Sequence, residues 1–401
     1  MLLLAFLLTT QVRTADPPQL PIKLPRHEYR IPPYPGLNLV GWGQVQSELG
    51  LAGRAVNSSN QRTYQPGTSP LNESMSQANL SGAQRERLGQ IYFQYYDVDA
   101  VMDPTVQRTL ALSSGQKAMA HTEFNRAWRK WQDAQEAMFE QFRKDNEAVR
   151  KRYLKEHPSS GISKSVRYTI PRDVSYRHSK LSRSVDLLQI TEMTKARAAV
   201  RASLTGSQRD KLEKLKGRPI ASAFYAHGSG LGGAQSHPEL ISNVNVQAEL
   251  GLSLKQYLAF MEKRRAGRSE GELQRELFAS LNLGQRKRLH QYGVQYDREY
   301  SILRHDVARS IGLTQETLDK INVRLFTLEV EAHDKADMYW IRLDKNPNDS
   351  SVRSDREQTL GRYDELKRKA ILDALTSGQI KLWRQLMGKQ LPDIQPKRFF
   401  G

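Results

Sequence analysis

A repeat within the chain constrains its fold more than any other feature of the sequence. The segment Leu80 to Tyr95, LSGAQRERLGQIYFQY, returns 201 residues later as Leu281 to Tyr296, LNLGQRKRLHQYGVQY. At the same offset, VQSELGL at Val45 to Leu51 returns as VQAELGL at Val246 to Leu252, with six of seven residues unchanged. We therefore interpret the chain as an internal duplication, with two tandem copies of one structural unit.

A short pattern recurs inside each copy and predicts where helices begin. Leu is followed by Ser, Thr or Asn and, three residues later, by Gln. The hydroxyl or amide can accept a hydrogen bond from an unpaired backbone N–H, and the Gln can return one to the cap. The pattern is complete six times and imperfect at Leu51 and Leu313, which predicts four helix starts per copy. The complete boxes pair Ser81 with Gln84, Ser113 with Gln116, Thr205 with Gln208, Ser253 with Gln256, Asn282 with Gln285 and Thr376 with Gln379.

The spacing of apolar residues predicts an all-α, elongated fold in which each copy has several helices and a long antiparallel helical hairpin. Hydrophobic residues make up 38% and charged residues 26% of the 401-residue chain, which suits helices with one apolar stripe. The first stripe of apolar residues follows the helix start at Ser81 and predicts one helix from Ser81 to Met102. A seam from Phe124 to Val149, with residues recurring at spacings of four and three, predicts a long helix to about Glu156. Its returning arm is predicted over Leu181 to Ser203.

The predicted organisation follows from the repeat and from shifts in composition. An apolar start predicts a secretory signal, so we expect an exported, periplasmic or extracellular protein. Seven of the 17 prolines fall between Pro17 and Pro35, which favours an extended tether. The expected segments are a signal peptide (1–15), a Pro-rich tether (16–38), a first repeat unit (39–220), a Gly-rich hinge (221–243), a second repeat unit (244–394) and a basic tail (395–401).

No motif in the sequence indicates catalysis or a cofactor. Gly228 to Gly233 matches the dinucleotide fingerprint, but neither the buried strand nor the helix that this site needs flanks it. His333, Asp334 and Asp337 place a histidine and a carboxylate four apart on one helix face, a spacing that can ligate a metal, but no third ligand is nearby in sequence and a solvated helix face is the better interpretation. With no catalytic pattern, we expect a protein that is not an enzyme and has no cofactor, metal or small-molecule substrate.

Charge indicates the kind of partner. Lys and Arg outnumber Asp and Glu by 61 to 43, giving a net charge of +18 that favours anionic partners such as nucleic acid, anionic envelope polymer or acidic protein. A solubilising surface would also explain this charge. The chain has no cysteine, which excludes disulfides and thiol chemistry.

The repeated Leu-Thr-x-x-Gln pattern, in a basic and cysteine-free helical chain, resembles the Spy-type periplasmic stress proteins and longer envelope proteins with tandem copies of this motif. This resemblance implies a helical hairpin cradle, often dimeric, whose basic and apolar surface holds unfolded protein clients without ATP. It rests chiefly on Leu80 to Gln116, Leu204 to Gly217, Leu252 to Thr314 and Leu375 to Gly388.

Two groups of residues are candidates for partner binding. Three polar positions beyond the first helix start recur at the same spacing in both copies, as Arg85, Arg87 and Gln94 and as Arg286, Arg288 and Gln295. Trp128 and Trp131 stand among basic residues and could hold aromatic-rich clients or stack on bases. Both tryptophans also fall on the apolar seam, where they would belong to the core.

Overall fold

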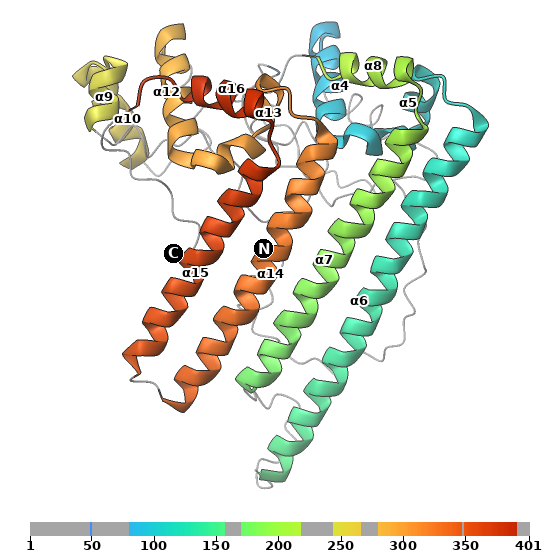
Figure 1. The fold of residues 1–401 in the computed structure, drawn as a ribbon, viewed down its shortest axis with the longest axis vertical. Helices are drawn as coiled ribbons and strands as arrows, with labels where there is room; N and C mark the ends of the chain where they lie inside the picture. The colour runs from blue at the N-terminus through green and yellow to red at the C-terminus, as the bar shows by residue number, and fades with distance from the viewer. Residues whose placement is uncertain are drawn as a thin grey trace. The chain divides into compact units, whose positions relative to one another are not determined.

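The computed structural model describes Leu49 and residues 80–156, 170–217, 244–265, 280–346 and 349–390. These residues form twelve α-helices and two 3-10 helices and include no strand (Figure 1), which confirms the all-α prediction. The predicted signal peptide, proline tether, glycine hinge and basic tail lie outside the described residues, and so does the dinucleotide-like glycine motif.

From α4 in the first half and α12 in the second, the order of the described elements is the same, although the duplication itself stays an inference from the sequence. In the first half the elements are α4 (Gly82–Tyr96), η2 (Asp97–Met102), α5 (Pro104–Thr109), α6 (Ser114–Glu156), α7 (Arg172–Ser203) and α8 (Gly206–Leu215). In the second half α9 (Val244–Leu250) and α10 (Leu254–Arg265) come first. They are followed by α12 (Leu283–Asp297), η4 (Arg298–Leu303), α13 (His305–Ser310), α14 (Gln315–Lys345), α15 (Ser350–Asp373) and α16 (Ser377–Met387).

All six complete capping boxes predicted from the sequence are present. At Ser81, for example, Gln84 N donates to the Ser81 hydroxyl, and the Ser81 N–H donates to Gln84 Oε1 at 2.8 Å. The same two bonds form at each of the other starts. At the imperfect start before α14, Thr317 N donates to the Thr314 hydroxyl. The Thr317 hydroxyl contacts the Thr314 hydroxyl and does not accept from the Thr314 backbone N–H, so the second bond of the box is missing.

The capping glutamines also bond to a second partner, which the sequence did not reveal. Gln84 Nε2 donates to the Leu49 carbonyl at 2.7 Å, and Gln285 Nε2 donates to the matching Leu250 carbonyl at 2.7 Å. Gln379 likewise reaches the Gly312 carbonyl. One amide therefore caps the start of a helix and satisfies a carbonyl of another segment.

Two predicted helix boundaries were wrong. The helix that starts at Ser81 ends at Tyr96 instead of Met102, because Asp97 adopts a positive φ of 47° and the chain continues as a 3-10 helix. Its counterpart Arg298 has a φ of 51° and also precedes a 3-10 helix. The returning arm α7 begins at Arg172, earlier than Leu181, directly after Pro171 and with Asp173 in its first turn, both of which favour a helix start.

The chain forms two compact units, and each draws on both halves. The long-helix unit comprises residues 124–156, 170–195, 326–346 and 349–363, and the short-helix unit comprises the other described residues. The repeat units predicted at 39–220 and 244–394 stay a prediction from the sequence.

Polar contacts join successive helices of the long-helix unit, whose ribbons are drawn in Figure 1. Between α6 and α7, Lys130 Nζ lies 2.8 Å from Glu192 Oε2 and Asp145 Oδ2 lies 3.1 Å from His178 Nε2, so the two helices run antiparallel. Between α14 and α15, the Tyr339 and Thr359 hydroxyls lie 2.9 Å apart. All eight residues of the predicted α6 seam are buried or half-buried, namely Phe124, Trp128, Trp131, Gln135, Met138, Phe142, Asp145 and Val149.

Apolar clusters from short elements form the core of the short-helix unit. In the second copy, Tyr300 and Ile302 of η4 pack with Leu325 of α14, Ile371 of α15 and Trp383 of α16. A neighbouring cluster of α9 and α12 includes Val246, Leu250 and Tyr292. The outer sides of these helices stay in solvent.

Candidate functional site

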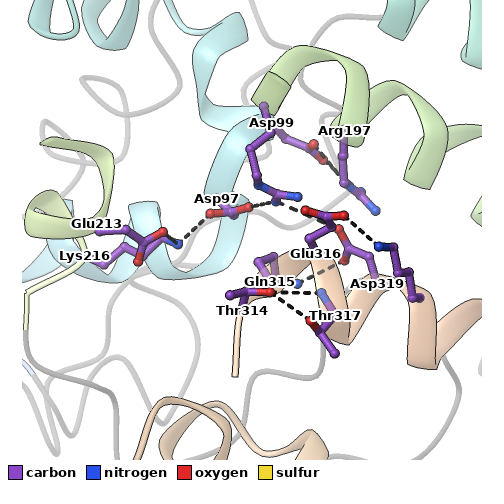
Figure 2. A network of polar contacts seen from close by, with 12 residues as sticks. Asp97, Asp99, Arg197, Glu213, Lys216, Thr314, Gln315, Glu316, Thr317 and Asp319 are labelled. Carbon is purple, nitrogen blue, oxygen red and sulfur yellow. Dashed lines mark hydrogen bonds and ion pairs between the residues drawn. The ribbon is translucent and has the colours of Figure 1, made fainter. Parts of the chain in front are cut away.

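A network of charged side chains lies in the short-helix unit, around the 3-10 helix η2 (Figure 2). Arg197 holds Asp99 in a bidentate pair, with Nε–Oδ1 and Nη2–Oδ2 distances of 2.9 Å. Asp97 accepts from Lys216 Nζ at 2.6 Å and from the Arg201 guanidinium. Asp97, Asp99, Arg197 and Lys216 are buried. We call these four residues, with Arg201 and Asp319, the ionic cluster.

Opposite charges determine the protonation of Asp97. Burial alone would raise its pKa, but the charges of Lys216 and Arg201 outweigh burial and hold the pKa of Asp97 well below its usual value. Burial opposes the charge on Lys216 as well, but Asp97 and Glu213 raise its pKa. These groups are therefore ionised together and stabilise one another.

Asp319, on α14, joins the cluster from the second copy and is held less tightly. Gln315 Nε2 donates to Asp319 Oδ1 at 3.0 Å, while Arg201 Nη2 lies 3.9 Å from Oδ2. Asp319 Oδ2 and Arg201 Nη1 are both buried without a hydrogen-bond partner in the structure. Burial therefore dominates and raises the pKa of Asp319.

This arrangement is typical of a structural ion-pair cluster. The carboxylates of Asp97 and Asp99 are saturated by cations, so neither is placed to accept a proton from a bound molecule. Breaking one such pair would leave a buried charge without compensation, which is strongly destabilising. The cluster therefore joins η2, α7 and the end of α8.

The recurring Arg and Gln positions beyond the first helix start fall into two classes. Gln94 is buried and donates to the Lys216 carbonyl, and Gln295 donates to the Met387 carbonyl at 2.6 Å. Arg87 bonds Gln90, and Arg288 bonds Gln291 at the same distance of 2.9 Å. These contacts at the ends of α8 and α16 give the recurrence a structural reason.

Arg85 and Arg286 form the second class, because both are exposed. Arg286 Nε donates to the Leu281 carbonyl at 2.8 Å, which leaves the side chain on the surface of α12. These two positions keep the predicted access to a partner.

Trp128 and Trp131 are half-buried on α6, with ring centroids 4.5 Å apart and planes tilted by 43°. Buried atoms with no hydrogen-bond partner include Trp131 Nε1. Their place on the α6 seam favours a packing role, and binding of clients or bases by these rings stays a prediction.

The carboxylates of Asp334 and Asp337 on α14 are paired with a neighbouring helix and are not part of a solvated face, which corrects the sequence interpretation for these two residues, whereas the His333 side chain is 43% exposed. Arg183 Nη2 of α7 lies 2.7 Å from both Asp334 Oδ1 and Asp337 Oδ2, and the two carboxylates are only 24% and 26% exposed. No group of three or more His, Asp or Glu in the described part of the chain is arranged to hold a metal ion.

Sequence reasoning missed the ionic cluster, although a signal was present. At the offset of 201, Asp97 becomes Arg298 and Asp99 becomes Tyr300. Positions where two otherwise similar copies exchange an acid for a cation or an aromatic would have indicated a local difference in packing.

Comparison with protein-family models, with curated proteins and with solved structures finds no match for this chain. Among the described helices, none combines the length and the apolar character needed to span a bilayer.

Proposed function

We propose that the protein is an exported, non-enzymatic helical protein that binds polypeptide clients or protein partners, in the manner of an ATP-independent chaperone or envelope stress protein. The observation that carries this proposal is a repeated exposed aromatic side chain. Phe139 of α6 is 54% exposed, and Trp340 of α14, at the matching position 201 residues later, is 48% exposed.

The surroundings of these aromatics suit weak binding of varied chains. Phe139 meets Phe142 edge-on at 6.3 Å, and Arg143 is exposed nearby on the same helix. Arg356 lies 5.2 Å from the Trp340 ring, and Met338, two residues before Trp340 in the chain, is 51% exposed. Large apolar side chains rimmed by charges are typical of protein interaction sites.

The proposal is tested by aggregation of a chemically unfolded protein diluted into buffer without nucleotide. The wild-type chain should suppress light scattering, and a variant with Phe139→Ser and Trp340→Ser should be roughly fivefold or more weaker, as loss of two aromatic anchors predicts. Leu154→Ser is the matched control, because Leu154 is exposed on α6 beyond the part that α14 matches. No suppression by the wild type at several-fold molar excess would contradict the proposal.

The second candidate is a basic binder of nucleic acid or anionic envelope polymer, favoured by the net charge of +18. Such binding should weaken steeply as salt rises, because counterions are released. Titration with a DNA duplex and with an anionic polymer at low salt distinguishes this function, since no binding there removes it.

Export is part of the proposal. Purification from the producing cell should give a mature chain that begins near Asp16 in the periplasmic or extracellular fraction. A chain that retains residues 1–15 in the cytoplasmic fraction would contradict export.

A further inference from the structure

Helices α12 and α16 of the short-helix unit pack together at one end. Gln295 of α12 donates to the Met387 carbonyl at 2.6 Å, and Arg288 Nη1 donates to the Lys389 carbonyl at 2.9 Å. The inner sides of the two helices are buried, with Tyr292 and Trp383 at 0% and 5% exposure. Their outer sides are therefore held in place by a packed core.

The outer sides combine aliphatic side chains with cations. Leu283, the first residue of α12, is 84% exposed, and Leu382 of α16 is 44% exposed. Lys287, Lys381 and Arg384 are exposed, and within the described part of the chain none of the three forms an ion pair. We call these five residues the second-copy surface.

The first copy has the same scaffold with a different surface. Gln94 of α4 donates to the Lys216 carbonyl after α8, as Gln295 does to Met387. At the five matching positions, however, acids replace the three cations, and glycine and lysine replace the two leucines. Leu283, Lys287, Lys381, Leu382 and Arg384 correspond to Gly82, Glu86, Asp210, Lys211 and Glu213, all exposed.

This difference has no explanation in the packing of the unit. The first-copy residues show that the scaffold forms without exposed leucines and without this cluster of cations. The two exposed leucines and the three cations without an ion pair in the described part of the chain together suit a partner that covers apolar side chains and carries opposite charge. Complementary charge requires an acidic partner, and the two leucines require apolar groups on it.

The arrangement favours a polypeptide over other anionic partners. A lipid bilayer is bound by helices with a continuous apolar face, whereas here each helix presents one exposed leucine. Phosphate backbones are bound by cations without a need for exposed aliphatic side chains. An acidic segment with leucines at helical spacing meets both requirements, because its carboxylates and its apolar side chains can lie on one side.

We infer that the second-copy surface of α12 and α16 docks an acidic, leucine-bearing polypeptide segment, and that the matching surface of α4 and α8 does not. The inference is independent of the proposed client binding, which involves Phe139 and Trp340 of the long-helix unit.

The test uses the full chain and a fluorescent synthetic peptide of glutamate and leucine, with the leucines at spacings of three and four. Fluorescence anisotropy should show saturable binding at low salt that weakens as salt rises. Exchanging three cations for the first-copy residues, Lys287→Glu, Lys381→Asp and Arg384→Glu, should weaken binding about tenfold or more, since each pair contributes modestly and each reversal adds repulsion.

A matched control separates this surface from general charge. Arg129→Glu, Arg150→Glu and Lys155→Glu change the net charge by the same amount at exposed positions of α6, and this variant should bind the peptide within about twofold of the wild type. The reverse exchange gives the first copy the residues of the second-copy surface and should add a second peptide site. It combines Glu86→Lys, Asp210→Lys, Glu213→Arg, Gly82→Leu and Lys211→Leu. Equal loss in the exchange variant and the control would overturn the inference.

Two further arms decide the class of partner. A DNA duplex and anionic phospholipid vesicles are titrated under the same conditions. Tighter binding of either than of the peptide, abolished by the same three substitutions, would overturn the choice of a polypeptide. Because the substitutions in α4, α8, α12 and α16 lie outside the long-helix unit, they should leave aggregation suppression unchanged, so failure of this inference is distinguishable from failure of the proposed function.

Discussion

The two copies build the same backbone turn from different side chains. In the first copy Asp97, at positive φ, is held by Lys216 and Arg201 in a buried cluster. At the matching positions the second copy has Arg298, Leu372 and Met387. There Trp383 Nε1 donates to Ser301 Oγ at 2.9 Å, and Leu372 and Met387 pack against the apolar core.

The shared features therefore determine the turn, and the ionic cluster is an addition to it. Both copies retain the capping box, the glutamine bond from the first helix to the end of the last, and the 3-10 helix after the positive φ. At the turn residue the first copy uses the charges of Lys216 and Arg201, whereas the second copy has apolar Leu372 and Met387 in their places. The buried ion pairs of the second copy lie beside its turn and join Arg304 to Asp297 and Asp306. Replacing parts of one copy by those of the other is thus the most direct way to examine the comparison.

The largest expected effect comes from giving the first copy the residue of the second at the end of α8. Lys216→Met leaves Asp97 buried with Arg201 as its main partner, and we expect the free energy of unfolding to fall by about 3 kcal/mol. Urea denaturation followed by circular dichroism measures the change. Adding Asp97→Asn should recover part of the loss, because the uncompensated charge is gone; a double variant less stable than Lys216→Met alone would contradict the ion-pair account.

A smaller effect is expected at the start of α6 and at the matching start of α14, which is the one imperfect helix start of the described chain. Gln116 Nε2 donates to the Ser203 carbonyl and to Gln208 Oε1, both at 2.8 Å, so Gln116→Ala should cost about 2 kcal/mol of stability. Thr317 stands at the matching position, and Thr317→Gln should raise stability by about 1 kcal/mol by completing the box. Thermal unfolding of both variants tests this pair, and a neutral or destabilising Thr317→Gln would show that the second copy closes this end differently.

The smallest effect concerns pH and separates two acids of the ionic cluster. The depressed pKa of Asp97 contributes stability that is present above the ordinary value of 3.8 and is lost as the pH falls through the folded pKa. The raised pKa of Asp319 acts in the opposite sense. Its contribution is present below 3.8 and is lost as the pH rises through the folded pKa, so ionised Asp319 is unfavourable at neutral pH.

Asp319→Asn should therefore stabilise the protein at pH 7, by up to about 1 kcal/mol, and leave the acid-induced loss in place. Asp97→Asn should lower stability at pH 7 and flatten the loss below pH 3.8. Unfolding free energies measured from pH 3 to pH 8 decide this. The opposite sign for Asp319→Asn would show that its attraction to the arginines outweighs its burial.

Sequence reasoning predicted the local features of this fold well and its long-range polar contacts poorly. Capping boxes and apolar seams depend on residues three or four apart, so Ser81 with Gln84 and the α6 seam could be read directly. The ionic cluster brings Asp97 to Lys216 across more than a hundred residues, and no spacing encodes such a contact. For the same reason the early end of α4 was missed, because its cause lies in tertiary structure.

The candidate site residues show the same division. Their recurrence was visible in the sequence, but recurrence alone did not separate Gln94, which holds a carbonyl in the interior, from Arg85 on the surface. The second-copy surface arises where the repeat fails, at Lys287 and Arg384 for example. Positions at which the copies disagree are thus more informative about partners than positions at which they agree.

The capping glutamines Gln84 and Gln285 connect the starts of two helices to residues that lie earlier in the chain. Gln84 and Gln285 each bond their own helix start and the carbonyl of a residue 35 positions earlier in the chain. The capping bonds need only the first turn itself, whereas the Nε2 bond of each glutamine forms only when Leu49 or Leu250 has been placed. Loss of the contact to Leu49 or Leu250 should therefore release the glutamine amide and speed the solvent exchange of the first-turn amide protons.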